Sequence, residues 1–302
     1  MPCAWPENGS ASVPDVATVG SAHLAGELDA AAALLARSGL GEPQREAARL
    51  WAAVAGTGLG EAWLRREMPA VAATVARFRR AVEHRAVGVP FAYAAGTVVF
   101  RTLELSIDRR ALIPRPETEG LVELVLRWSR ERGAERRGLV ADIGTGSGCI
   151  ALALAVEGSF ERVIATDASE AAAALARENV ARIAPPVPVE VRVGDLVAPI
   201  GGLACRAIVS NPPYLTDEEW ADLDPAVGDH EPADALHSGP DGLAATRRLL
   251  AGARDVLEPG GLLALEIDER RAAAVRELAV AAGWRVSIHR DLFGRPRYAL
   301  AV

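Results

Sequence analysis

The sequence lacks lysine altogether. All 33 basic side chains other than histidine are therefore arginine, and 40 acidic residues leave a formal net charge of −7 at pH 7. We attribute the abundance of arginine and alanine to genomic base composition before any function. A net negative chain is atypical of a protein that coats nucleic acid nonspecifically, so we expect no stable nucleic-acid partner.

Cysteines and long apolar runs are also scarce. The three cysteines, Cys3, Cys149 and Cys205, lie far apart and match no metal-binding spacing, so we expect no metal site. A sparse, odd set of cysteines is typical of a reducing cytoplasm. No apolar run is long enough to span a bilayer, and the stretch from Met1 to Ser12 lacks the pattern of a secretory signal. We therefore expect a cytoplasmic protein with no membrane partner.

The chain has 302 residues, of which 50% are hydrophobic and 24% charged, which predicts one large or two modest domains. Residues 1–20 are rich in proline, glycine and serine and predict a flexible tail. Residues 21–90 predict an N-terminal helical bundle. The expected helices are Leu24–Arg37, Pro43–Ala55, Glu61–Met68 and Pro69–Arg85.

From residue 91 the pattern of apolar residues changes to a period of two, which predicts a β-hairpin linker over residues 91–111. Over residues 112–302 strands and helices alternate, which is typical of a doubly wound α/β sheet with helices on both faces. The expected strands are 139–143, 162–166, 189–193, 207–210, 262–267, 285–289 and 298–302. The expected helices begin near Thr118 and then cover 149–156, 170–183, 243–256 and 269–282.

The run Asn211-Pro212-Pro213-Tyr214 follows a buried strand and predicts a stiff corner at its carboxyl end. Proline fixes φ, has no N–H group and holds the preceding residue extended. The side-chain oxygen of Asn211 and the carbonyl oxygen of Pro212 thus form a rigid pair of acceptors beside the ring of Tyr214. Such a pair suits a planar amino group, whose two N–H bonds need two acceptors. The structural alternative is a proline-rich turn with a half-buried tyrosine.

A glycine-rich loop lies between the first strand of the predicted sheet and the next helix. It comprises Gly144, Thr145, Gly146, Ser147 and Gly148. Such a loop lets a ligand approach the backbone at the crevice where open α/β sheets bind. Asp142, just before the loop, favours a cationic ligand over a pyrophosphate, and S-adenosylmethionine is cationic and carries no phosphate. The alternative is a structural glycine turn capped by Asp142.

Two further acids end the following strands. Asp167 lies about 20 residues past the glycines, where a carboxylate can accept both hydroxyls of a ribose. Alternatively it caps the next helix, with Ser169 as a competing cap. Asp195 ends the third strand and suits the exocyclic amine of adenine, or shapes a turn beside Gly194. Because the acids and Asn211 end successive strands, we expect them at one edge of the sheet.

Two other groups of titratable residues resemble catalytic or metal-binding groups. Glu117 and Glu119 have the spacing of paired acid/base carboxylates, but we expect them to serve the N-terminus of the following helix and to brace the active-site loop. His230 and His237 match no metal spacing, and we expect them to be loop histidines in a segment that shapes the substrate entrance.

With these motifs the chain resembles the protein-(glutamine-N5) methyltransferases called PrmC or HemK, which act on peptide chain release factors. The resemblance covers nearly the whole chain. It rests on Tyr93–Gly96, Leu112–Glu119, Asp142–Gly148, Asn211–Tyr214 and Asp291–Arg297. It implies a class I S-adenosylmethionine-dependent methyltransferase domain over residues 112–302, with a Rossmann-like sheet of seven strands, and an N-terminal bundle that docks the substrate.

The resemblance also implies roles for single residues. S-adenosylmethionine would be held by Gly144, Thr145, Gly146, Ser147, Gly148, Asp167, Asp195, Leu196 and Asn211. The substrate glutamine would be held by Asn211, Pro212, Pro213 and Tyr214, with Asn211, Pro212 and Tyr214 catalytic. Leu196 stands where some members of the family carry an aromatic residue. The implied activity is methyl transfer to the side-chain amide of the glutamine in the GGQ motif of release factors, and we expect a monomer.

Three other functions are compatible with parts of the pattern. The four residues Asn211–Tyr214 would equally suit the amino group of adenine or guanine in a nucleic-acid methyltransferase. The acidic chain, without an obvious basic stripe, disfavours that alternative. A catalytically silent binding module would not need the intact acceptor motif. A dehydrogenase is disfavoured by Asp142 and by the glycine spacing.

Overall fold

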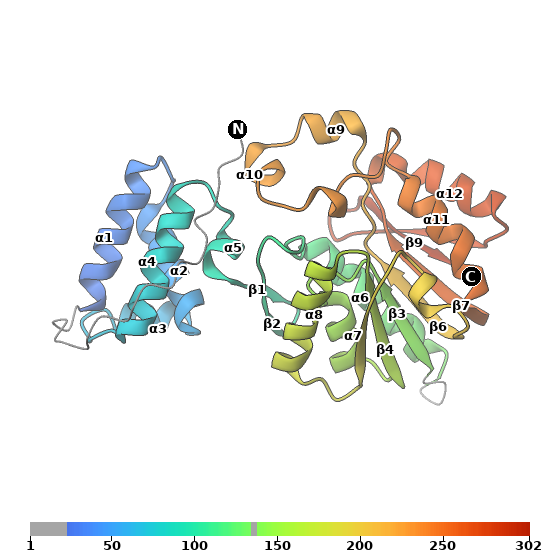
Figure 1. The fold of residues 1–302 in the computed structure, drawn as a ribbon, viewed down its shortest axis with the longest axis horizontal. Helices are drawn as coiled ribbons and strands as arrows, with labels where there is room; N and C mark the ends of the chain where they lie inside the picture. Colours follow the sequence, from blue (N-terminus) through green and yellow to red (C-terminus); the bar gives the residue numbers. More distant parts are fainter. Residues whose placement is uncertain (1–22, 134–137) are drawn as a thin grey trace. The chain divides into compact units, whose positions relative to one another are not determined.

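The computed structural model describes residues 23–133 and 138–302, so the tail predicted at residues 1–20 lies outside the described residues. The protein divides into two compact units, with the division between Arg79 and Arg80. The N-terminal unit is helical, and the C-terminal unit contains the large sheet with its helices (Figure 1).

Helices that pack through their apolar faces form the N-terminal unit. They are α1 (Leu24–Arg37), α2 (Pro43–Ala55), α3 (Leu59–Leu64) and the first part of α4 (Ala72–Ala86). Trp51 and Phe78 pack edge to face in this core, with ring centroids 5.3 Å apart. The buried carboxylate of Glu27 accepts two hydrogen bonds from Arg79, at 2.6 and 2.8 Å. This ion pair ties α1 to α4.

The predicted bounds of α1 and α2 are confirmed, but those of α3 and α4 are wrong. The segment after α3 pairs with the start of α1, where the Leu24 N–H donates to the Met68 carbonyl at 3.1 Å and the Ala25 N–H to the Arg66 carbonyl at 2.6 Å. Pro69 therefore lies in a bridged segment and does not open a helix, and α4 begins only at Ala72. This pairing depends on tertiary contacts, which the local helix signals do not contain.

A short helix, α5 (Phe91–Ala95), precedes the hairpin and was not predicted, because five residues are too few to show a helical period. The hairpin of β1 (Thr97–Phe100) and β2 (Leu103–Ser106) is confirmed. At its tip the Arg101 N–H donates to Glu119 Oε1 at 2.9 Å. Glu119 thus lies in the first turn of α6 (Pro116–Glu131), as predicted, but its carboxylate braces the hairpin and not the active-site loop.

Seven strands form one sheet in the order β5-β4-β3-β6-β7-β9-β8. They are β3 (Leu139–Ile143), β4 (Arg162–Asp167), β5 (Val189–Val193), β6 (Cys205–Ser210), β7 (Leu257–Glu266), β8 (Val286–Arg290) and β9 (Pro296–Ala301). Strands β3 to β7 are parallel, and β9 runs antiparallel to both β7 and β8. The predicted doubly wound sheet is confirmed. From β3 the chain adds β4 and β5 on one side and then crosses to add β6 and β7 on the other side. Sheets of this kind bind ligands at the switch point, here between β3 and β6.

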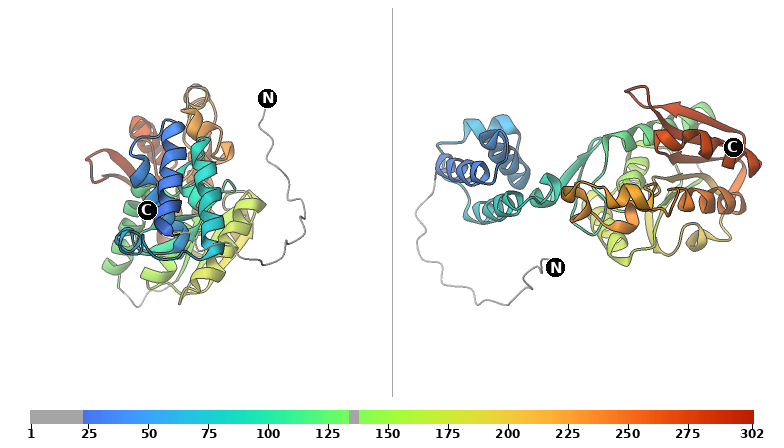
Figure 2. Two further views of the ribbon diagram at one scale, coloured as in Figure 1. Left: turned by 90° about the vertical axis from the view of Figure 1, so that its left-hand side faces the viewer. Right: turned by 90° about the horizontal axis from the view of Figure 1, so that it is seen from above.

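Helices cover both faces of the sheet (Figures 1 and 2). Helix α6, α7 (Cys149–Glu157) and α8 (Glu170–Ile183) pack on one face, and α11 (Ala244–Gly252) and α12 (Ala272–Ala281) pack on the other. The alternation of side chains along β3 serves both layers, since Val140 belongs to the first core and Leu139, Ala141 and Ile143 to the second. Two short helices, α9 (Asp217–Ala221) and α10 (Pro225–Gly228), lie in the segment after β6.

Tyr298 on β9 fixes the start of α6, because its hydroxyl donates to the Glu117 carbonyl at 2.7 Å. We expect Tyr298→Phe to lower the free energy of unfolding by about 1 kcal/mol, since a partly buried carbonyl would lose its donor. Urea unfolding measures this change. Ser287→Ala on the exposed side of edge strand β8 is the control, and equal midpoints for the two variants would contradict the role of the hydroxyl.

Candidate active site

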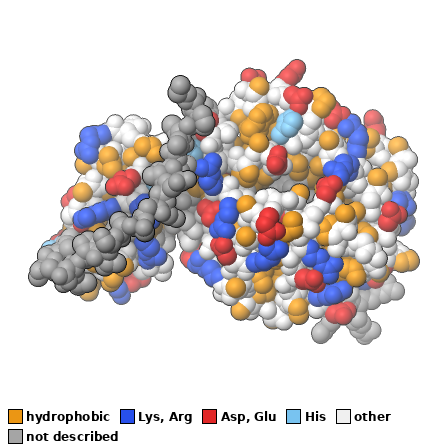
Figure 3. Space-filling model, viewed as in Figure 1, with side chains coloured by type: hydrophobic (Ala, Val, Ile, Leu, Met, Phe, Trp, Pro, Cys, Tyr) orange, Lys and Arg blue, Asp and Glu red, His pale blue; other side chains and the backbone are white. Residues whose placement is uncertain are grey.

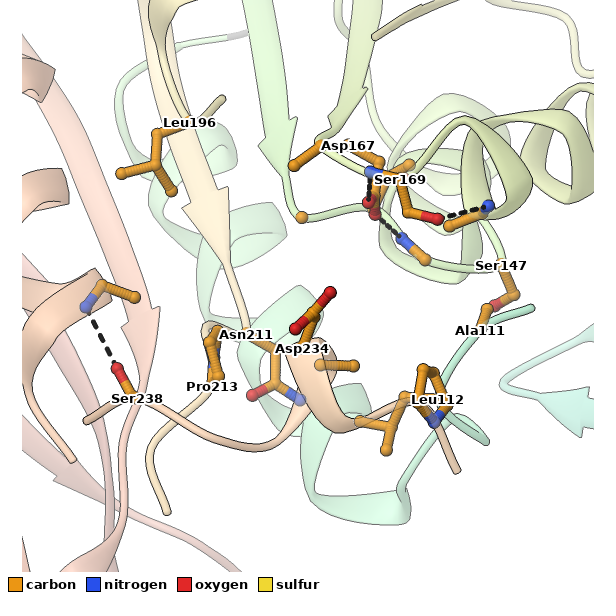
Figure 4. Close-up of a pocket in the computed structure, with 18 of the residues that line it drawn as sticks. Ala111, Leu112, Ser147, Asp167, Ser169, Leu196, Asn211, Pro213, Asp234 and Ser238 are labelled. Carbon is orange, nitrogen blue, oxygen red and sulfur yellow. Dashed lines mark hydrogen bonds between the residues drawn. The ribbon is translucent and has the colours of Figure 1, made fainter. Parts of the chain in front are cut away.

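A cavity of about 620 Å³ opens at the carboxyl edge of the sheet. This volume falls in the range of small-molecule sites, roughly 300–1,000 Å³. Its walls come from the loop before α6, the glycine loop, the ends of β4, β5 and β6, and the segment 232–239. Figure 4 shows Asp167, Asn211 and Asp234, from three of these elements, around the same space.

The glycine loop bends back over the end of the sheet. Gly144, Gly146 and Gly148 have φ angles of 71°, 54° and 83°, a region that residues with side chains rarely adopt. The N–H groups of Gly144 and Thr145 both donate to the Thr166 carbonyl, at 2.8 and 2.9 Å. The loop from Gly144 to Ser147 therefore lines the cavity with backbone, whereas Gly148 is the N-cap residue of α7 and lies outside the lining.

Asp142 lies beneath this loop and not in the cavity. Its side chain is fully buried, and its Oδ2 accepts from the Thr145 hydroxyl at 2.6 Å and from the Ala151 N–H at 3.1 Å. Burial raises the pKa of this carboxyl to about 7, against the lowering effect of the two hydrogen bonds. The expectation that Asp142 selects a cationic ligand is therefore wrong as to direct contact, and the carboxylates at the cavity surface are those of Asp167, Asp195 and Asp234.

The raised pKa of Asp142 has a consequence for stability. Between its unfolded pKa near 4 and its folded pKa near 7, the native state keeps a proton that the unfolded chain has lost, so stability falls as pH rises. We expect Asp142→Asn, which keeps one acceptor oxygen, to flatten the fall in unfolding free energy between pH 6 and 7 by about 1 kcal/mol. Urea unfolding at the two pH values checks this, and parallel slopes for the variant and the parent would count against it.

The acids at the ends of β4 and β5 both line the cavity but have different partners. Asp167 accepts from the Gly146 N–H and the Ser169 N–H, each at 2.9 Å, and burial raises the pKa of its carboxyl. Ser169 is the N-cap of α8, so Asp167 is not the cap. Asp195 is exposed and forms an ion pair with Arg248. To contact an adenine amine as predicted, the Asp195 carboxylate would therefore have to accept from that amine in addition to Arg248, or in place of it.

The corner at residues 211–214 brings only part of the motif to the cavity. Asn211 and Pro213 line it, whereas Pro212 is buried and Tyr214 lies outside the lining. The Tyr214 N–H donates to the Leu236 carbonyl at 3.1 Å, and burial raises the pKa of the tyrosine hydroxyl to about 12. The binding and catalytic roles of Pro212 and Tyr214 stay predictions.

The Asn211 side chain is held from behind by two residues that the motif does not contain. Its Nδ2 donates to Thr118 Oγ1 at 3.2 Å, and the Thr118 hydroxyl donates to Glu266 Oε2 at 2.7 Å. Thr118 and Glu266 are each only 2% exposed. Thr118 comes from the first turn of α6 and Glu266 from the last residue of β7.

An ion pair and a hydrogen bond join the loop before α6 to the segment after β6 at the cavity. The buried carboxylate of Glu231 accepts from Arg115 Nη2 at 2.6 Å and from the Ile113 N–H at 3.3 Å. The same segment carries Asp234, in the 3₁₀ turn Ala233–Ala235, whose exposed carboxylate lines the cavity. His237 also lines the cavity, and its Nε2 lies 2.5 Å from Asp217 Oδ1.

Several of these residues were missed by the sequence analysis. Glu266 ends β7, so the rule that singled out the acids ending β4 and β5 would have found it two strands further along the chain. Asn179 on α8 is fully buried and donates to the carbonyls of Ser147 and Ser106, at 2.9 and 3.0 Å. It thereby ties the glycine loop to the hairpin, and nothing in its local sequence indicates this.

Known proteins share both parts of this chain. Residues 28–96 match the family model described as PrmC N-terminal domain, and residues 124–224 match the Methyltransferase small domain. A release factor glutamine methyltransferase of Moorella thermoacetica is 43% identical over 231 residues, which are 76% of this chain and 80% of that protein. One of Deinococcus radiodurans is 39% identical over 274 residues, which are 91% and 96% of the two chains. The chain belongs to the release factor glutamine methyltransferase family.

The fold of this family member is also found in solved structures. The catalytic domain of hMettl16, in complex with the MAT2A 3'UTR hairpin 6, superposes with a TM-score of 0.52 at 18% identity, covering 76% of this chain and 80% of that one. At this identity the similarity concerns the fold alone, and the predicted class I methyltransferase fold is confirmed. Within residues 23–133 and 138–302, each helix is too short or too polar to cross a membrane.

Proposed function

We propose that the protein transfers a methyl group from S-adenosylmethionine to the side-chain amide nitrogen of the glutamine in the GGQ motif of peptide chain release factors. The observation that carries this proposal is the 39–43% identity, over most of the chain, to proteins named release factor glutamine methyltransferase. The cavity supports it, because Asn211, whose amide is hydrogen-bonded to Thr118, lines the same cavity as the glycine loop.

The cavity fits S-adenosylmethionine in size and charge. Its volume of about 620 Å³ suits a ligand of that size. Asp167 beside the glycine loop would hold the ribose, while Gly144–Ser147 would lie against the methionine part and Asp195 and Leu196 against adenine. The carboxylate of Asp234 has no hydrogen bond or ion pair to the described residues and adds negative charge that suits a cation. When bound, this cofactor supplies a methyl group on a positively charged sulfur.

Asn211 and the backbone at Pro212 would hold the glutamine amide. An amide nitrogen is a poor nucleophile because its lone pair is delocalised into the carbonyl. Fixing the amide in line with the methyl group supplies roughly 7–11 kcal/mol of the barrier. Acceptor oxygens fixed at the nitrogen stabilise the positive charge that grows there as the N–C bond forms. The alkylated nitrogen then loses a proton to solvent without a dedicated base.

We further propose that the N-terminal bundle docks the release factor, since residues 28–96 match the model described as PrmC N-terminal domain. A nucleic-acid substrate is the alternative for the same cavity. On the face shown in Figure 3, arginine and acidic side chains are interspersed over the C-terminal unit. A surface of that kind lacks the continuous positive charge that holds a phosphate backbone.

Mass spectrometry of purified release factor tests the proposed function. After incubation with the protein and S-adenosylmethionine, the peptide that contains the GGQ motif should gain the mass of one methyl group on glutamine. Release factor with that glutamine changed to alanine is the control. Tritium transfer to RNA or DNA, with none to release factor, would instead establish the nucleic-acid alternative.

A further inference from the structure

A chain of hydrogen bonds runs from the interior of the C-terminal unit to the cavity. It begins at the buried carboxylate of Glu266, passes through the Thr118 hydroxyl at 2.7 Å and ends at Asn211 Nδ2 at 3.2 Å. The three residues come from β7, α6 and the end of β6, so that separate elements converge on one amide. Thr118 and Glu266 are 2% exposed, which leaves water little access to replace either partner.

The donor and acceptor properties of these groups allow one arrangement when Glu266 is ionised. A carboxylate only accepts, so the single hydroxyl proton of Thr118 must point to Glu266. The Thr118 oxygen is then an acceptor toward Asn211 and can pair only with the Asn211 amino group. The Asn211 carbonyl oxygen therefore turns away from Thr118 and is available as an acceptor on the cavity side.

We infer that Thr118 and Glu266 are positioning residues that fix Asn211 as a hydrogen-bond acceptor, and thereby select a carboxamide over a carboxylate side chain. This inference rests on the proposed function and deepens it. An acceptor at this position pairs with the N–H of a glutamine amide, whereas a glutamate would offer no N–H. If the Asn211 amide were reversed, its amino group would face the cavity and would repel the N–H of glutamine.

The state of Glu266 should set this orientation, because a protonated carboxyl can donate to Thr118 and release the hydroxyl proton toward Asn211. Burial raises the pKa of Glu266 to about 7, against the hydrogen bond from Thr118. The charged or titratable groups around it are Arg297 on β9, Glu117 and Arg115 at the start of α6, Tyr214, Tyr298 and Cys149. Turnover should therefore rise with pH around 7, in parallel with ionisation of Glu266.

Thr118→Val and Thr118→Ser form the matched pair that tests the inference. Valine keeps the shape of threonine but has no hydroxyl, and serine keeps the hydroxyl. We expect Thr118→Val to lower kcat for release factor methylation about 10-fold with S-adenosylmethionine affinity unchanged, and Thr118→Ser to stay within about 3-fold of the parent. Glu266→Gln should lose the rise of kcat around pH 7. Parent-like kcat in Thr118→Val, or an unaltered pH profile in Glu266→Gln, would overturn the inference.

Urea unfolding of the same variants gives a readout that does not depend on the reaction. The unfolding equilibrium constants of Thr118→Val, Asn211→Ala and the double variant should show a coupling of about 5-fold, because the two residues share one hydrogen bond. Independent effects would overturn the hydrogen-bond chain. A parent protein that binds S-adenosylmethionine but leaves release factor unmethylated would overturn the proposed function, while the coupling would still decide whether Thr118 orients Asn211.

Discussion

Asn211→Ala is expected to remove most methyl transfer to release factor while leaving the affinity for S-adenosylmethionine nearly intact. The Asn211 amide is the one side chain of the 211–214 corner that both lines the cavity and is fixed by a partner, at Thr118. Its loss deletes an acceptor for the nitrogen at which positive charge grows. Removing one preorganised group of this kind costs about 10²–10³ in kcat.

The measurement pairs steady-state kinetics with calorimetry of cofactor binding. Ser287→Ala, on edge strand β8 at the end of the sheet order, controls for handling of the variants. A near-normal kcat in Asn211→Ala would remove Asn211 from the reaction. A large loss of cofactor affinity with kcat preserved would place Asn211 in the cofactor site only.

Asp167→Ala should instead lower the affinity for S-adenosylmethionine, which Asn211→Ala is expected to leave nearly intact. Its carboxylate receives the Gly146 and Ser169 N–H groups, so it both presents charge to the cavity and fixes the glycine loop. Losing a charge-assisted partner for the ligand costs roughly 1–3 kcal/mol, which is about 5- to 150-fold in Kd. Calorimetry with S-adenosylmethionine measures the change.

Asp195→Ala is the matched comparison for Asp167→Ala. Asp195 also lines the cavity from a strand end, but it is exposed and paired with Arg248. An exposed acid with a competing partner should contribute less, about 1 kcal/mol or below. If the two variants bind the cofactor equally well, the assignment of Asp167 to the ribose fails.

Most of the C-terminal fold could be predicted from local patterns. The predicted bounds are correct for the strands at 139–143 and 189–193 and for the helix at 170–183. Each is an uninterrupted segment with glycine, proline or a capping residue at its ends. Boundaries that depend on partners were missed. Helix α4 begins at Ala72 since the preceding segment pairs with α1, and β7 begins at Leu257, five residues before the strand predicted at 262–267.

The sequence was sufficient to predict those residues of the candidate site that lie at the ends of strands. Asp167, Asp195, Asn211 and the glycines each lie at or just after the end of a recognisable strand, and parallel strands end at the same edge of a sheet. Asp142, the last residue but one of β3, lies at the same edge, yet its side chain turns inward and accepts from Thr145 and Ala151. Sequence position places a residue at the edge but does not tell on which side of the loop its carboxylate lies.

The sequence by itself determined the family, the class of the fold and the residues that stand at the ends of the strands, since these follow from periodicity and from short motifs. Only the tertiary structure decided which way the Asn211 amide turns. Its orientation depends on Thr118, 93 positions away, and on Glu266, 148 positions from Thr118. Contacts across such separations arise only when α6 packs against β7, so no local pattern encodes them.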